Sequence, residues 1–357
     1  MSRIIIGMSG GVDSAVAASI LIDEGHDVEA FFMKNWEEES EYCTSEQDYI
    51  DALQVCDSLK IPLHSVNFAK EYWDRVFQYF LEEYKNGRTP NPDVLCNNEI
   101  KFKEFLNHAL ELGADKIATG HYVRTDNRDG TIKLLKGLDH SKDQSYFLYG
   151  LDQKQISSAL FPIGDHIKSD VRKKAEKLGF DNFDKKDSVG ICFIGERNIK
   201  DFLKQYIPAN PGFIITSDGQ NIGQHDGLMY YTIGQRKGLG IGGGHSDVDG
   251  AWYVIEKNIE HNQLIVGQGH NNPALYHKFL KASKLHWISG NMPENNGLKA
   301  KIRYRANDVP CQIKDIDQNN ISIEFETPCF GIAPGQSVVF YDGDLCLGGA
   351  IIDSYSN

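Results

Sequence analysis

The stretch Ile4-Ile5-Ile6-Gly7-Met8-Ser9-Gly10-Gly11-Val12-Asp13-Ser14 joins an apolar strand to a helix through a short glycine-rich loop. Gly10 and Gly11 allow positive φ angles and a close approach of the backbone to an anion. Ser9, Ser14 and the unpaired N–H groups at the start of the helix can donate hydrogen bonds to phosphate oxygens. The loop is therefore typical of a pyrophosphate-binding turn. The alternative is an ordinary glycine turn between a strand and a helix.

The loop differs from the other common phosphate-binding motif. A Walker A loop places a lysine followed by Ser or Thr at the helix start, and the chain has no lysine between Ser9 and Ser19. This argues against a GTPase or a kinase. The string Ser-Gly-Gly-Val-Asp-Ser after a strand resembles the PP-loop of the ATP pyrophosphatase superfamily, which implies that ATP, with Mg²⁺, is split into AMP and pyrophosphate. The ATP-binding residues would include Gly7, Met8, Ser9, Gly10, Gly11, Val12, Asp13 and Ser14.

Length and composition set the class of protein. A chain of 357 residues is long enough for two or three domains. The 41% hydrophobic and 24% charged fractions are those of a globular protein. No apolar run approaches the ~20 residues that cross a bilayer, and Met1-Ser2-Arg3 leads into a strand instead of a signal peptide. We therefore expect a cytoplasmic protein without a membrane partner.

The seven cysteines are scattered and form no Cys-x-x-Cys pair. This argues against a disulfide framework, a zinc ribbon and a cysteine-ligated iron–sulfur cluster, so no metal site is expected. The net charge of −13 would count against a nucleic-acid partner, but basic residues gather within residues 168–186 and 299–305. A one-sided basic surface is compatible with this pattern, although each run alone is typical of a solvated face.

The first part of the chain alternates strand and helix patterns. This rhythm predicts an α/β fold with a doubly wound parallel sheet, in which ligands bind beyond the carboxyl ends of the strands. The expected strands are Arg3–Met8, Val28–Met33, Leu63–Phe68 and Ile117–Thr119, and the expected helices are Ala15–Glu24, Gln47–Leu59, Trp73–Tyr84 and Phe102–Leu112.

Two further residues fall at the same edge of this predicted sheet. Met33 closes the second strand and could pack on an adenine ring. Gly120 follows a later strand and could let the backbone approach the nucleotide. Each could equally be a core or turn residue.

The texture of the sequence changes twice after the α/β part. We expect a catalytic ATP-binding domain over residues 1–205 and a small β-rich central domain over 206–275, where glycine, proline and β-branched residues alternate. A C-terminal antiparallel β-barrel is expected over 276–357, with strands in Leu298–Tyr304 and Ser337–Tyr341.

The segment Gly87–Asn97 carries a carboxylate three residues before a thiol. Asp93 and Cys96 could share one face of a turn or helix start. A thiol near a helix N-terminus is more often ionised, and a nearby carboxylate can carry a proton. The alternative is that Asp93 caps the helix and Cys96 is a small buried residue.

The segment Asp187–Glu196 holds a second cysteine, Cys192, among glycines, where it could carry sulfur as a persulfide or serve only in packing. Two loop cysteines on a scaffold that adenylates an oxygen form a coherent system, because ATP turns the oxygen into a leaving group that sulfur can replace.

Several long motifs occur in one order along nearly the whole chain. They are Gly-Met-Ser-Gly-Gly-Val-Asp-Ser, Phe-Met-Lys-Asn-Trp, Thr-Pro-Asn-Pro-Asp-Val-Leu-Cys-Asn, Ala-Thr-Gly-His-Tyr, Lys-Asp-Gln-Ser-Tyr-Phe-Leu, Gly-Ile-Cys-Phe-Ile-Gly-Glu-Arg, Gly-Gln-Arg-Lys-Gly-Leu-Gly and Pro-Gly-Gln-Ser. Through them the chain resembles the tRNA-specific 2-thiouridylase family of the MnmA type. The resemblance implies that O2 of the wobble uridine, position 34 of tRNAs for lysine, glutamate and glutamine, is adenylated and then displaced by sulfur.

The resemblance also implies roles for the two cysteines. Cys192 matches the persulfide carrier, Cys96 the second catalytic cysteine and Asp93 the acid/base. Each turnover would end in a Cys96–Cys192 disulfide, whether the persulfide attacks directly or Cys96 first frees hydrosulfide; the sequence leaves both routes open. Either route needs a reductant and an external persulfide donor, a cysteine desulfurase or a sulfur-relay protein.

The remaining matches concern tRNA. The base must leave the anticodon stack, and Asn91, Pro92 and Asp93 match the segment that meets it. The other residues that align with family tRNA contacts are His121, Lys142, Asp143, Gln144, Arg303, Tyr304 and Gln336.

Two other functions fit parts of the sequence. One is an amide- or amidine-forming PP-loop ligase similar to argininosuccinate or GMP synthetase, which needs no cysteine pair. The other is a non-catalytic, nucleotide-binding RNA adaptor with structural cysteines.

Overall fold

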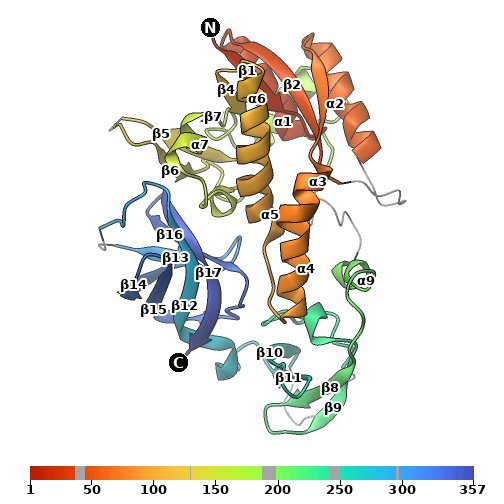
Figure 1. The fold of residues 1–357 in the computed structure, drawn as a ribbon, viewed down its shortest axis with the longest axis vertical. Coiled ribbons are helices and arrows are strands. Elements are labelled where there is room, and N and C mark those ends of the chain that lie inside the picture. The colour runs from red at the N-terminus through yellow and green to blue at the C-terminus, as the bar shows by residue number, and fades with distance from the viewer. Residues whose placement is uncertain (37–44, 129, 187–197, 242–249, 295–296) are drawn as a thin grey trace.

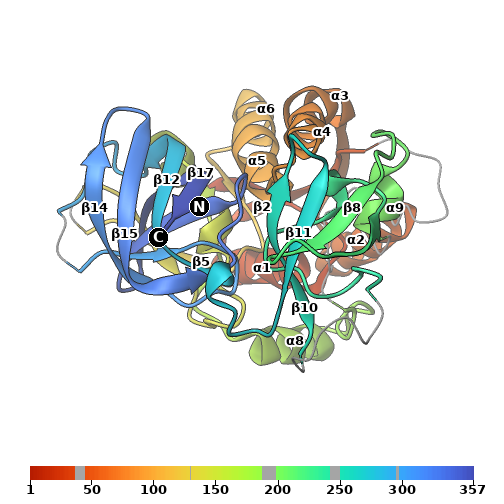
Figure 2. The same cartoon turned by 90° about the horizontal axis from the view of Figure 1, so that it is seen from below.

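The computed structural model describes residues 1–36, 45–128, 130–186, 198–241, 250–294 and 297–357. Its strands form three sheets of five, four and eight strands (Figure 1). The parallel-sheet unit lies at the top of Figure 1, and the barrel and the four-stranded sheet lie side by side beneath it, as Figure 2 also shows. In the described part of the chain, no helix has the length and apolar character needed to span a bilayer.

The N-terminal unit is a parallel sheet covered on both faces. The strand order is β3-β2-β1-β4-β7, and every pairing is parallel. Ile4 and Ile6 of β1 pack into one core, whereas Ile5 packs into the other. The doubly wound α/β prediction is therefore confirmed. The strands are β1 (Arg3–Gly7), β2 (Asp27–Lys34), β3 (Leu63–Asn67), β4 (Lys116–Ala118) and β7 (Ala159–Leu160).

Different sets of helices cover the two faces of the parallel sheet. The core that contains Ile4 and Ile6 also holds residues of α1 (Val12–Asp23), α2 (Ser45–Leu59) and α8 (Lys168–Lys177). The opposite core is larger and holds the aromatic residues of two long helical rods. The first rod is α3 (Ala69–Tyr72), the π-helical η1 (Trp73–Phe77) and α4 (Gln78–Lys85); the second is α5 (Pro92–Leu95), the π-helical η2 (Cys96–Phe105) and α6 (Leu106–Glu111).

The second rod begins earlier than the sequence pattern predicts. The expected helix starts at Phe102, but the observed one starts at Pro92. Asn91 caps it by accepting a hydrogen bond from the Asp93 amide, and Pro92 occupies the first turn, where a proline costs no hydrogen bond. Local capping therefore extends the helix into the segment that was expected to be a loop.

A four-stranded sheet follows, in the order β10-β11-β8-β9. It is mixed, because β11 runs parallel to β8 while the other pairs are antiparallel. Its elements, with the helices beside it, are α9 (Ile199–Leu203), β8 (Gly212–Thr216), β9 (Asn221–His225), η4 (Leu228–Tyr230), β10 (Trp252–Asn258) and β11 (Gln263–Gln268).

The C-terminal strands form a closed antiparallel barrel, as the sequence predicts. The order β12-β15-β14-β13-β16-β17 is closed by pairing of β17 with β12. The expected strand Leu298–Tyr304 is too long: β13 ends at Lys301, and Arg303 turns inward to donate to the carbonyls of Ile233 and Gly331. The elements are η5 (Pro273–Leu275), β12 (Tyr276–Trp287), β13 (Lys299–Lys301), β14 (Val309–Ile316), β15 (Asn320–Phe330), β16 (Ser337–Asp342) and β17 (Leu345–Ser356).

The barrel sheet also takes two strands from the N-terminal part of the chain. The hairpin of β5 (Val123–Asp126) and β6 (Lys133–Lys136) pairs with β17. Nearby are η3 (Ser145–Phe147) and α7 (Gln153–Ser157). The parallel-sheet unit and the barrel are thus joined through a shared sheet.

Candidate active site

The loop between β1 and α1 has the geometry of a phosphate-binding turn. Gly10 has φ +74°, and a Cβ there would lie 2.2 Å from the Asp48 carbonyl oxygen. The Ser14 hydroxyl accepts from the Ser9 amide at 3.2 Å and donates to the Gly11 carbonyl at 3.0 Å. Gly11 caps α1 without any side-chain hydrogen bond. The first amides of α1 therefore receive no side-chain cap, which leaves them suited to an anion.

A lysine from a distant helix reaches this loop. Lys168, 155 residues from Asp13 in sequence, places its Nζ 2.8 Å from both carboxylate oxygens of Asp13. The Tyr122 hydroxyl donates to the same carboxylate at 2.7 Å. Lys168 is only 8% exposed, and its own amide donates to Asp139 at the start of α8. This role could not be predicted from the sequence, because Lys168 lies in a basic run that is compatible with either a one-sided basic surface or a solvated face.

Gly120 and Met33 lie beside the elements at the two ends of the loop. A Cβ on Gly120 would be 2.8 Å from the Asp13 carbonyl carbon and the Ser14 amide nitrogen, so the end of β4 touches the start of α1. Met33 lies beside Gly7, with its methyl carbon 3.1 Å from where a Gly7 Cβ would be. The two residues therefore flank the two ends of the loop, and their contact with a nucleotide stays a prediction.

Residues shortly before the Cys192 segment in the sequence contact the same loop and the helix beside it. Asn182 donates to the Gly10 carbonyl at 3.0 Å, and Lys185 donates to Asp48 at 2.7 Å. Cys192 itself lies outside the described residues, as does any pairing with Cys96. The described chain before it is nevertheless bonded to the phosphate loop.

Asp93 and Cys96 lie three residues apart on the second helical rod. The alternative that Asp93 caps this helix is wrong, because Asn91 is the cap. Residues at this spacing share a helix face. Cys96 is 4% exposed and packs in the hydrophobic core, as the alternative for this residue expects. It also opens the π-helical segment η2, a geometry often found at functional sites. Burial raises the pKa of the Asp93 carboxyl, and the charge of Lys101 partly counteracts this rise. A carboxyl with a raised pKa is suited to moving a proton.

His121 is buried and, like Asp93, is affected by the charge of Lys101. Burial holds its pKa well below the usual range, and the charge of Lys101 lowers it further. Its Nδ1 lies 2.8 Å from the Thr119 hydroxyl, and its ring faces Phe102 and Phe161. His121 is therefore a neutral side chain, and Lys101 acts on both it and Asp93.

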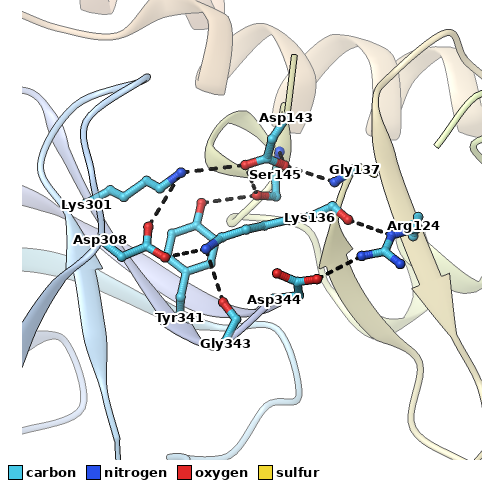
Figure 3. A network of polar contacts seen from close by, with 10 residues as sticks. All are labelled: Arg124, Lys136, Gly137, Asp143, Ser145, Lys301, Asp308, Tyr341, Gly343 and Asp344. Atoms are coloured by element: carbon cyan, nitrogen blue, oxygen red, sulfur yellow. Dashed lines mark hydrogen bonds and ion pairs between the residues drawn. The ribbon is translucent and has the colours of Figure 1, made fainter. Parts of the chain in front are cut away.

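Asp143 belongs to a buried polar network between the hairpin and the barrel (Figure 3). It is 5% exposed and accepts hydrogen bonds from the Gly137 amide at 3.2 Å and from the Ser145 amide at 3.1 Å. Lys301 approaches it at 3.7 Å. The same network pairs Lys136 with Asp308 and places the Ser145 and Tyr341 hydroxyls 3.2 Å apart.

The other residues matched to tRNA contacts also have partners inside the protein. Gln144 accepts from the Tyr122 amide at 2.9 Å, and Gln336 donates to the carbonyls of Thr89 and Pro90. Burial lowers the pKa of Arg303. Tyr304 packs on Phe147 with ring centroids 4.4 Å apart, and the Lys142 amide donates to the Asp139 carbonyl. Contact of these residues with tRNA stays a prediction.

Three family models match successive parts of the chain. They are described as a tRNA methyl transferase HUP domain over residues 2–196, a tRNA methyl transferase PRC-barrel domain over 200–268 and an aminomethyltransferase beta-barrel domain over 277–352.

Curated relatives match over nearly their whole length. The chain is 57% identical to a tRNA-specific 2-thiouridylase MnmA of Citrobacter koseri, covering 98% of this chain and 96% of the relative. It is 55% identical to the enzyme of the same name from Pseudomonas syringae, covering 99% and 94%. Among solved structures, a 4-thiouridine synthetase–RNA complex with bound ATP covers 58% of this chain and 50% of its own, at 18% identity and a TM-score of 0.36, too low to carry an argument.

Proposed function

We propose, from the premise that this chain belongs to the tRNA-specific 2-thiouridylase family, that its loop between β1 and α1 activates a tRNA uridine with ATP and that two cysteines deliver the sulfur. Family membership makes the protein a tRNA-modifying transferase, an enzyme that forms 2-thiouridine. The observation that carries the proposal is the uncapped start of α1 with Lys168 and Asp13 beside it.

The first step uses this phosphate site. O2 of the wobble uridine attacks the α-phosphorus of ATP, the bond to the β-phosphate oxygen breaks, and pyrophosphate leaves. The α1 amides and the Lys168 ammonium group stabilise the charge on the leaving pyrophosphate. In the described part of the chain no three His, Cys, Asp or Glu side chains gather into a metal site. Mg²⁺ in nucleotide sites is held mostly by phosphates with one or two carboxylates, and Asp13 would serve as such a carboxylate once the Lys168 ammonium group had moved from it to the phosphates.

The second step replaces oxygen by sulfur. In one route the terminal sulfur of a Cys192 persulfide attacks C2, the C2–O bond breaks, and AMP leaves; the Cys96 thiolate then attacks Cys192 Sγ and releases the thiolated base. In the other, Cys96 first releases hydrosulfide, which attacks C2. Both routes end in a Cys96–Cys192 disulfide. A cellular reductant must supply two electrons to reduce this disulfide to two thiols before the next turnover. A persulfide donor protein supplies the sulfur.

Proton transfer and base placement belong to the start of the second rod. Asp93, whose pKa is raised by burial, acts as the general acid/base: it accepts a proton from one reacting group and later donates it. Asn91, the N-cap of α5, and Pro92, its first residue, directly precede Asp93 and would meet the flipped uridine. The proposed substrate is the wobble uridine of the tRNAs for lysine, glutamate and glutamine.

Cysteine variants test this proposal. Purified protein with unmodified tRNA, ATP, Mg²⁺ and a persulfide donor should form 2-thiouridine, measured by nucleoside mass spectrometry. Cys96→Ala and Cys192→Ala should each abolish it while tRNA binding is kept. Cys56→Ala, a buried cysteine of α2, is the matched control and should keep activity. Full thiolation by either of the first two variants would overturn the sulfur route.

A further inference from the structure

The segment Gly87–Pro90, here called the strap, connects α4 to the helix that bears Asp93 and Cys96. It belongs to no helix or strand. Its backbone is held from outside, because residues of both the barrel and the four-stranded sheet bond to it. The strap is where these two units touch the segment that leads to the proposed catalytic residues.

The barrel holds the strap at its middle. The Thr89 amide donates to the Pro334 carbonyl at 2.8 Å. The side-chain amide of Gln336 donates to the Thr89 carbonyl at 2.8 Å and to the Pro90 carbonyl at 3.2 Å. Gly335 has φ +92°, and a Cβ there would lie 2.9 Å from the Thr89 backbone. The two backbones are therefore in direct contact, with Gln336 bridging two successive carbonyls.

The four-stranded sheet and its neighbouring turn hold the strap on the other side. Lys257 of β10 donates to the Gly87 carbonyl at 2.8 Å. Gly87 has φ +72°, and a Cβ on it would lie 2.5 Å from a methyl carbon of Ile259. The hydroxyls of Thr232 and Thr89 lie 3.2 Å apart. The strap is thus fixed between two units that come later in the sequence.

A shift of the strap is transmitted directly to the helix that bears Asp93 and Cys96. Pro90 and Pro92 have fixed φ angles, so little rotation can absorb a shift between them. Asn91, between the two prolines, caps the helix through the Asp93 amide at 3.2 Å. A displacement of the Pro90 carbonyl therefore moves the helix start.

We propose that Gln336 is a positioning residue that sets Asp93 and Cys96 for reaction by holding the strap, before any tRNA is bound. The inference rests on the proposed roles of Asp93 and Cys96. It gives Gln336 a task that is independent of contact with RNA. A misplacement of about 1 Å at a reacting group is enough to cost about a hundredfold in rate.

The test uses Gln336→Glu, which keeps the side-chain shape but puts carboxylate oxygens against two carbonyls. Without tRNA, hydrogen exchange over residues 88–96 should become faster. With tRNA, kcat for 2-thiouridine formation should fall by about tenfold or more, while the Kd for tRNA stays within about twofold. Gln312→Glu, on an exposed position of β14 in the same barrel, makes the same charge change and should alter neither measurement.

Each outcome decides the proposal. Unchanged exchange over residues 88–96, or an unchanged kcat, would overturn it. Unchanged exchange together with weaker tRNA binding would make Gln336 an RNA contact. If Gln336→Glu does not fold, Gln336→Met removes the same two hydrogen bonds without adding charge and must give the same two changes. If the unaltered protein forms no 2-thiouridine, the proposed function fails, and the exchange measurement still decides whether Gln336 holds the strap.

Discussion

At the scale of single residues, the phosphate site is completed by a side chain from far along the chain. The loop Ser9–Ser14 contains no lysine, yet Lys168 places its ammonium group on Asp13. The pair is buried on the lysine side, where the side chain is 10% exposed, and more open on the Asp13 side at 31%. A cation held in this way can pair with the β- and γ-phosphates when ATP enters.

Replacing this lysine should separate ATP from AMP. Lys168→Met should weaken ATP binding by about 10- to 100-fold, the value of one charge-assisted contact. AMP lacks the β- and γ-phosphates, so its affinity should change little. Isothermal titration calorimetry measures both. Lys174→Met, on the same helix with a surface pair to Asp23, is the matched control. Equal losses for ATP and AMP would show that Lys168 only shapes the loop.

Lys101 should tune the proposed acid/base residue. Burial raises the pKa of Asp93, and the Lys101 charge lowers it. Lys101→Met removes the lowering effect, so Asp93 loses its proton only at a higher pH. If Asp93 must be ionised to accept a proton, the low-pH limb of the single-turnover rate moves to higher pH. Lys103→Met, an exposed lysine paired with Glu99 on the same rod, should leave the limb in place. An unmoved limb in Lys101→Met would remove Asp93 from the rate-determining proton transfer.

Residues whose role is local could be predicted from sequence. The loop Ser9–Ser14 is such a case, because its glycines and its neighbouring strand and helix lie within one short stretch. Lys168 and Gln336 could not, since each acts on a segment more than a hundred residues away. Neither the basic run around Lys168 nor the Pro-Gly-Gln-Ser stretch around Gln336 carries a local sign of the distant segment that the side chain contacts.

At the scale of elements, the hairpin β5–β6 was not anticipated as part of the barrel sheet. No strand is predicted from the sequence for either of its segments, and the pairing of β6 with β17 depends on residues about two hundred positions later. The helix from Pro92 was placed too late for a different reason. Its apolar periodicity is weak before Phe102, whereas its start is set by the Asn91 cap.

The network in Figure 3 fixes this hairpin, and Asp143 is its buried acceptor. Asp143→Ala should lower the free energy of unfolding by about 2–5 kcal/mol, because it leaves buried donors unpaired. Urea denaturation measures the change. Asp165→Ala, whose side chain is 78% exposed, should change it little. Unchanged stability with weaker tRNA binding would instead make Asp143 an RNA contact.

At the scale of the whole molecule, three units meet at the strap, and the partly buried side chain of Lys257 makes stability depend on pH. Burial lowers the pKa of Lys257 from 10.5 to about 7. Between these values the unfolded chain holds a proton that the folded protein lacks, so the free energy of unfolding rises with pH.

The variant Lys257→Met should flatten this rise, which is at most about 1.4 kcal/mol per pH unit. Urea denaturation from about pH 7 to about pH 9 measures it. The difference between the two proteins isolates Lys257 from the buried tyrosines and cysteines, which titrate in both. Identical slopes would show that burial does not hold the Lys257 amine in its neutral form.

Activation of O2 of the uridine by ATP leaves an isotopic signature, because the oxygen that is adenylated departs with AMP. tRNA carrying ¹⁸O at O2 of the wobble uridine is thiolated by the protein with ATP and a persulfide donor, and the nucleotide product is weighed by mass spectrometry. AMP should carry the heavy oxygen, in equal amount to the 2-thiouridine formed. Heavy oxygen in inorganic phosphate with ADP as the product, or unlabelled AMP, would contradict it.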